Sequence, residues 1–199
     1  VSFTNATLVL SIGETVEEVT DSGLLARAPT LTVQLLADDS ILQVHPGGVR
    51  HVRQGGRSAE WKPPGKRTIE KASANARQVA ISLGGGELVY FELDAAGTLV
   101  EMGQKDLGVD VNCLDVGSLS TGRARSLFLA VGGYDSSVRI LGLAPGEGRL
   151  VELASMQVSA IAESLAFAEM AMEVGATTAA PSAGSASTVV SDGGGECPG

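Results

Sequence analysis

Aromatic residues, cysteines and long apolar runs are all scarce in this sequence, and each shortage removes a class of protein. Aromatic residues make up only 4% of the 199 residues, so a core must be built mainly from Val, Leu, Ile and Ala. Two cysteines, Cys113 and Cys197, cannot form the disulfide framework of a small secreted domain. No apolar run approaches the ~20 residues of a membrane-spanning helix, and the first residues do not resemble a signal peptide. We therefore expect a soluble protein of a reducing intracellular compartment, with no membrane partner.

Positive charge is also in short supply. The chain carries 14 Lys and Arg residues against 23 Asp and Glu residues, a net charge of −9. Affinity for nucleic acids rests largely on Lys and Arg side chains that neutralise phosphates. The charge balance therefore argues against a domain that binds RNA or DNA as a whole.

Histidine is scarce as well, which limits metal and acid–base chemistry. The two histidines, His45 and His51, flank the segment Pro46-Gly47-Gly48 and are placed to face each other across a hairpin. A metal site usually needs three or four ligands, and no cysteine or acidic pair lies at ligand spacing nearby. No Ser/His/Asp or Cys/His arrangement stands out either. We expect no enzymatic activity, no metal and no cofactor, and we interpret both histidines as hairpin residues.

Most of the chain consists of short apolar runs separated by Gly, Pro, Asn, Asp and Ser. Such runs occupy residues 8–12, 31–36, 41–44 and 49–52. The last two form the clearest hairpin, joined by Pro46-Gly47-Gly48, where we expect glycine to supply a positive φ. Asn5-Ala6-Thr7 matches a glycosylation sequon, but we expect the apolar run at residues 6–12 to be buried and therefore unmodified. The pattern predicts an all-β fold.

An internal repeat sharpens this prediction. Residues 77–85 can be laid over residues 125–133, 48 positions later, and in both copies an acidic residue and a second β-rich run follow. Weaker copies begin at Ile41 and Leu8. Repeats of roughly 40–50 residues, each several strands long, are typical of β-propeller blades. We predict a partial β-propeller of about three to four WD40-like blades, over residues 1–172, that belongs to a larger ring. Residues 173–199 have no period, and we expect a disordered, flexible tail or insertion.

The glycines of the repeat need a separate interpretation, because a strand followed by Gly84-Gly85-Gly86 resembles a phosphate-binding loop. Such a loop needs a Lys, then Ser or Thr, and then a helix. Here Glu87 follows, and then a β-branched and aromatic run. A carboxylate would repel phosphate, so we predict an architectural turn. The glycines that we assign to turns are Gly47, Gly48, Gly84, Gly85, Gly132 and Gly133.

Eight of the fourteen cations lie within residues 50–77, which we call the basic segment. They are Arg50, Arg53, Arg57, Lys62, Lys66, Arg67, Lys71 and Arg77, and the first seven form our candidate interaction patch. Only Glu60 and Glu70 offset them locally. A patch of this kind suits an acidic partner or an RNA backbone, whereas loop-tip cations that water solvates are the alternative we favour. Trp61 is the only aromatic available for base stacking, and we interpret it as a packing anchor between blades.

Several stretches resemble a family of very large triple-propeller proteins. They are residues 2–10, 13–19 and 60–66, and the resemblance extends over about residues 1–170. The family has branches in pre-mRNA splicing, in cullin ubiquitin ligases that recognise damaged DNA, and in cleavage and polyadenylation. Residues 85–92 and 125–132 are most similar to the splicing branch. The resemblance places the chain in the second, middle propeller, but the tail departs from the family pattern.

The resemblance implies a nuclear, non-catalytic scaffold of the U2 small nuclear ribonucleoprotein. It would act in branch-site recognition and spliceosome assembly. The implied partners are the other subunits of the splicing factor 3b complex, above all the helical-repeat subunit, with RNA contact at most indirect or peripheral. Two alternatives stay open: an adaptor of a cullin ubiquitin ligase, and direct RNA contact through the basic segment.

Overall fold

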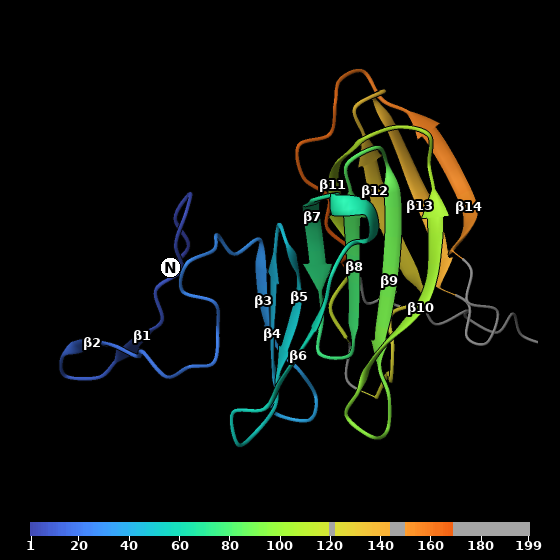
Figure 1. The fold of residues 1–199 in the computed structure, drawn as a ribbon. Helices are drawn as coiled ribbons and strands as arrows, with labels where there is room; N and C mark the ends of the chain where they lie inside the picture. Colours follow the sequence, from blue (N-terminus) through green and yellow to red (C-terminus); the bar gives the residue numbers. More distant parts are fainter. Residues whose placement is uncertain (120–121, 144–149, 169–199) are drawn as a thin grey trace, which may run out of the picture. The chain divides into compact units, whose positions relative to one another are not determined.

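A computed structural model describes residues 1–119, 122–143 and 150–168, which belong to one compact unit, Val1–Glu169. Three four-stranded antiparallel sheets make up most of this unit (Figure 1). Within these residues, no helix is long and apolar enough to cross a membrane. The predicted tail at residues 173–199, with Cys197, lies outside the part of the chain that the structure describes.

Each sheet is built from four consecutive strands, and each strand pairs with its neighbour in sequence. The first blade contains β3 (Thr32–Leu35), β4 (Ile41–His45), β5 (Gly48–Val52) and β6 (Ser58–Trp61). The second contains β7 (Ile69–Ala74), β8 (Gln78–Leu83), β9 (Glu87–Leu93) and β10 (Leu99–Asp106). The third contains β11 (Val111–Asp115), β12 (Phe128–Gly133), β13 (Ser137–Leu143) and β14 (Leu150–Gln157). A short 3₁₀ turn, η1 (Pro64–Lys66), connects the first two blades.

The first strands of the blades are neighbours, β3 with β7 and β7 with β11. The strands then follow in order to the outer strands β6, β10 and β14. This is the arrangement of propeller blades around an axis, with the innermost strand first. The all-β, partial-propeller prediction is confirmed.

The weak repeat at Leu8 does not produce a fourth sheet within the described residues. It forms only the hairpin of β1 (Leu10–Ile12) and β2 (Val16–Glu18). The prediction that residues 6–12 are buried is wrong in part. Thr7 is buried and its hydroxyl contacts Ala28 O and Thr30, but the side chain of Ile12 is 83% exposed. Among the described residues, no facing sheet covers the apolar side chains of this hairpin.

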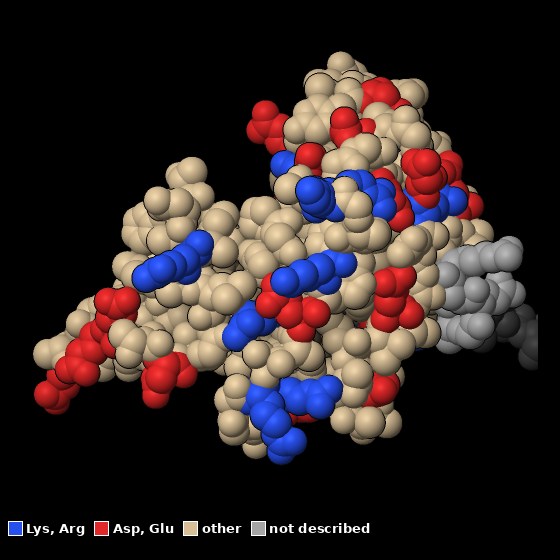
Figure 2. Space-filling view, viewed as in Figure 1, with Lys and Arg blue, Asp and Glu red and all other residues tan. Residues whose placement is uncertain are grey.

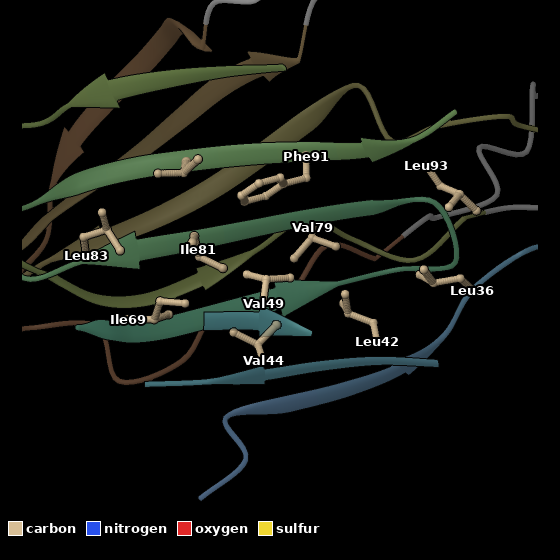
Figure 3. Packing of buried hydrophobic residues seen from close by; sticks show 11 residues of the cluster. Leu36, Leu42, Val44, Val49, Ile69, Val79, Ile81, Leu83, Phe91 and Leu93 are labelled. Carbon is tan, nitrogen blue, oxygen red and sulfur yellow. The ribbon is translucent and has the colours of Figure 1, made fainter. Parts of the chain in front are cut away.

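Two hydrophobic clusters hold the blades together, and the second blade contributes to both. On β8, Val79 and Ile81 belong to the cluster shared with the first blade, and Ala80 belongs to the cluster shared with the third. Figure 3 shows the first cluster, where Val44 and Val49 lie near Ile81 and Phe91. Successive side chains of a strand point to opposite faces, so a strand packed on both faces needs a continuous apolar run. This explains the apolar sequence of β8 and β9.

The stretch that resembled a phosphate loop is the hairpin between β8 and β9. Leu83 pairs with Glu87, and the three glycines between them form the turn. Gly85 and Gly86 both have positive φ, 94° and 85°. A Cβ on Gly86 would lie 2.2 Å from Val109 O, so this position requires glycine for space as well as for conformation.

The prediction of a positive φ in Pro46-Gly47-Gly48 is wrong. Pro46 and Gly47 form the turn, and neither glycine has a φ in the left-handed region. Gly48 is already part of β5, where a Cβ would lie only 2.6 Å from the backbone oxygen of Trp61. Close approach of β6, and not turn geometry, requires glycine here. Gly132 and Gly133 likewise are the last residues of β12 and stand before its turn.

Beyond the third blade, residues 161–168 run along β11. Asn112 Nδ2 donates a hydrogen bond to Ala162 O (2.8 Å), and Phe167 N donates one to Asp115 Oδ2 (2.7 Å). The ring of Phe167 lies 6.4 Å from that of Phe128. This segment therefore occupies the place beside an inner strand where a further blade would begin.

Candidate interaction surface

The basic segment does not form one continuous patch, because strand pairing distributes its cations. Arg50 lies on β5 directly opposite Glu60 on β6, and their side chains form an ion pair at 3.4 Å. Its Nε also donates to Gly23 O (2.8 Å). Arg67 forms an ion pair with Glu87. Figure 2 shows Lys and Arg side chains distributed over this face among Asp and Glu.

The other members of the candidate patch lie in three different places. Arg53 and Arg57 flank the loop between β5 and β6, and Arg53 N donates to Arg57 O (2.8 Å). Lys62 and Lys66 are exposed at the opposite end of β6, around η1. Lys71 lies on β7 and lines a depression next to Asn112 and Cys113 on β11. The structure therefore offers two separate pairs of exposed cations.

A groove between the first and second blades lies beside one of these pairs. We call it the inter-blade groove, and it has a volume of about 210 Å³. Its lining residues are Val49, His51, Arg53, Ala59, Glu60, Trp61, Phe91, Thr98 and Leu99. The strands β5, β6, β9 and β10 supply most of them.

Trp61 bridges the two blades at this groove. Its ring meets that of Phe91 edge to face, with centroids 5.2 Å apart and an angle of 79° between the planes. Its indole Nε1 donates a hydrogen bond to Glu101 Oε2 on β10 (3.0 Å). A second link between the blades runs from Arg53 Nη2 to Thr98 Oγ1 (3.0 Å). Trp61 therefore packs between blades, as an anchor does, and its edge borders the groove.

The two histidines do not face each other. In the antiparallel pairing of β4 with β5, His51 lies opposite Leu42 and His45 lies opposite Gly48. His51 Nε2 lies 2.6 Å from Ser40 Oγ, and burial lowers the pKa of His51. Ser40 also contacts Asp38, so the serine stands between the other two groups. In a hydrolytic triad the histidine holds that middle position, so this arrangement is a structural link.

His45 is likewise used by the hairpin. Its Nδ1 accepts a hydrogen bond from Gly47 N (3.2 Å), and its Nε2 lies 3.6 Å from Glu60 Oε1. Burial lowers the pKa of His45 as well. In the described part of the chain, no group of three His, Cys, Asp or Glu side chains is arranged to hold a metal ion.

A buried polar network that sequence reasoning missed connects the second and third blades. Gln78, on β8, is fully buried. Its Nε2 donates to Ser126 O (3.0 Å) and to the Tyr90 hydroxyl (2.5 Å). Its Oε1 accepts from Asn75 Nδ2 (3.0 Å) and from Ser126 N. A polar side chain at the start of a mostly apolar strand is the only sequence signal of this network.

The network ends in an ion pair at its rim. Tyr90 donates from its hydroxyl to Glu92 Oε1 (2.6 Å), and Glu92 pairs with Arg125, which precedes β12. Burial raises the pKa of Tyr90, so the hydroxyl keeps its proton and its role as a donor. Through Ser126 and Arg125, this network connects the second blade to the segment that precedes β12 of the third blade.

Comparison with known proteins matches this architecture. A family profile described as "RSE1/DDB1/CPSF1 second beta-propeller" matches residues 1–190. Spliceosome-associated protein 130 A of Arabidopsis thaliana is 54% identical over 176 residues, covering 88% of this chain and 14% of that protein. Splicing factor 3B subunit 3 of Danio rerio is 52% identical over 171 residues, covering 85% of this chain and 14% of that protein. The chain thus spans about one seventh of the length of these relatives.

A likeness to solved structures concerns the fold. The crystal structure of the RRP9 WD40 repeats superposes with a TM-score of 0.55 at 14% identity, over 70% of this chain and 44% of the other. The family profile covers nearly the whole sequence, and the three blades are those of a propeller. The chain belongs to the RSE1/DDB1/CPSF1 family and corresponds to part of its second β-propeller.

Proposed function

We propose that this chain serves as part of a nuclear, non-catalytic protein-interaction scaffold in pre-mRNA splicing. The proposal rests on sequence identity. Over most of its length, the chain is more than 50% identical to proteins that are named for the spliceosome or for splicing. The proposal concerns the long protein to which the blades would contribute, because the relatives are several times longer.

The use of polar residues supports a scaffold role. Gln78 and Trp61 each make a hydrogen bond across a blade boundary, and His51 is bound by Ser40 within the first blade. The first two contacts fix one blade against the next. A stack held in this way presents its loops and outer strands in constant positions, which suits binding of other proteins.

The proposed partners are the other subunits of the splicing factor 3b complex in the U2 small nuclear ribonucleoprotein, foremost its helical-repeat subunit. Through them the scaffold would act in branch-site recognition and spliceosome assembly. We also propose that residues 1–172 supply the blades. Contact with RNA would be peripheral, because Arg50 and Arg67 are already ion-paired.

Affinity purification from nuclear extract tests the proposal. The full chain, tagged at one end, should recover splicing factor 3b proteins well above a tag-only control, as measured by quantitative mass spectrometry. Recovery of a cullin and its ligase subunits instead would assign the chain to the ubiquitin-ligase branch. Recovery of neither group would contradict the proposal.

A further inference from the structure

The inter-blade groove has an apolar floor and a basic end. Val49 and Phe91 are about 1% exposed and form part of the first core cluster. Trp61 and Leu99 are partly buried and pack against the same cluster. Its volume of about 210 Å³ is below the roughly 300 Å³ at which pockets begin to enclose a drug-sized ligand. The recess therefore suits one aliphatic side chain.

The acidic groups around the groove already have partners. Glu60 pairs with Arg50. Glu101 accepts hydrogen bonds from the Trp61 indole and from Gln104 Nε2 (2.7 Å). Asp94 accepts from the backbone N–H groups of its own loop. These carboxylates are thus neutralised or hydrogen-bonded locally.

The cations at the lower end of the groove are in a different situation. Arg53 lines the groove, and its guanidinium group donates to the neutral Thr98 hydroxyl. Neither Arg53 nor Arg57 has an ion pair with any described residue. The loop between them, Gln54-Gly55-Gly56, contains no acidic residue, and nothing lies within 4 Å of a Cβ built on either glycine. Figure 2 shows cations gathered at the lower end of the first blade. Arg53 therefore lines the apolar recess without an ion-pair partner among the described residues, and Arg57, also without one, is bound to it through the backbone at the other end of the loop.

We propose that the inter-blade groove binds an acidic peptide segment of a partner protein, with one aliphatic side chain inserted between Trp61 and Leu99. Carboxylates next to that side chain would pair with Arg53 and Arg57, where bidentate contacts with guanidinium groups are favourable. An apolar anchor with a charged rim is the arrangement found at the energetic centre of many protein interfaces. The inference deepens the proposed scaffold function by naming the chemistry of one partner.

Trp61 allows the proposal to be tested directly, because it is the only tryptophan of the chain. The probe is a synthetic peptide, Asp-Glu-Leu-Glu-Asp, blocked at both ends and titrated into the full chain at low ionic strength. We expect a saturable change in tryptophan fluorescence that weakens as salt is added. Matched peptides with Ala in place of Leu, or with Lys in place of the four acids, should bind at least tenfold more weakly.

Three variants locate the binding. The double variant R53E/R57E should lose at least tenfold in affinity, and K66E, which reverses a charge at the other end of β6, should keep the affinity of the unchanged protein. Ala59 is exposed on β6 and lines the groove, so A59L should fill the recess and weaken binding by a similar factor without altering charge. Circular dichroism of each variant establishes that it is folded.

Several results would overturn the inference. These are no saturable signal, equal binding of the acidic and lysine peptides, or equal effects of R53E/R57E and K66E. Tighter binding of a single-stranded RNA oligonucleotide than of the acidic peptide, lost in R53E/R57E, would assign the surface to nucleic acid instead. Failure of the peptide to bind while splicing factor 3b proteins still co-purify would refute the groove and leave the proposed function standing.

Discussion

At the scale of single residues, sequence alone identified which side chains are charged but not how they are used. Residues 50–77 form one basic segment in the sequence. In the structure, however, Arg50 forms an ion pair with Glu60 on the neighbouring strand, and Arg67 forms one with Glu87 of the second blade. Those partners follow from strand register, which no local pattern specifies. The sequence did not reveal the role of Gln78 for the same reason, because its hydrogen-bond partner Ser126 lies 48 positions away.

Gln78 provides the sharpest residue-scale prediction. Its replacement in Q78A would leave the backbone N–H and C=O of Ser126 without their partner and would remove one of the two hydrogen bonds of the Tyr90 hydroxyl, which keeps Glu92. Each unsatisfied group costs about 1–3 kcal/mol, so we expect a loss of about 3 kcal/mol in the free energy of unfolding. Urea denaturation followed by circular dichroism measures this loss.

The matched control is Q104A. Gln104 is exposed on β10 and makes one surface hydrogen bond, to Glu101. Its replacement should change the free energy of unfolding by at most about 0.5 kcal/mol. If Q78A and Q104A changed the free energy of unfolding equally, the buried network between the second and third blades would contribute no more to stability than a surface hydrogen bond.

At the scale of strands and turns, the sequence was most informative where a pattern repeated. The alignment of residues 77–85 with residues 125–133 correctly predicted hairpins, because turn residues and apolar runs recur with the blade. The conformation of individual glycines was less predictable. Gly48 is needed because β6 passes close to it, and closeness of another strand is a tertiary property.

The turn between β8 and β9 gives the element-scale prediction. In G86A, the new Cβ would lie 2.2 Å from Val109 O in addition to requiring a positive φ. We expect a loss of more than about 2 kcal/mol in the free energy of unfolding, because strain and backbone overlap act together.

G55A separates these two contributions. Gly55 also has a positive φ, 80°, but nothing lies within 4 Å of an added Cβ. Thermal or urea unfolding should show a loss of only about 1 kcal/mol, the cost of the left-handed conformation alone. If G55A were as destabilising as G86A, the contact between the β8–β9 turn and Val109 would not matter.

At the scale of the whole molecule, the blade pattern and the family resemblance together predicted the fold and the family. The described residues contain three blades, and the last of them exposes apolar side chains such as Leu153, 56% exposed, and Phe128, 42% exposed. Such side chains agree with a chain that contributes part of a larger assembly. Which surface meets a partner could not be read from the sequence, because the inter-blade groove joins residues from 49 to 99 through folding.

Chemical cross-linking of the affinity-purified chain after ribonuclease treatment tests the central claim most directly. Cross-links from exposed lysines such as Lys62 and Lys66 identify by mass spectrometry which proteins touch the blades. We predict cross-links to splicing factor 3b proteins that persist after RNA is removed, because the scaffold would bind proteins and not RNA. Loss of all partners with the RNA, or cross-links only to cullin-ligase subunits, would contradict this account.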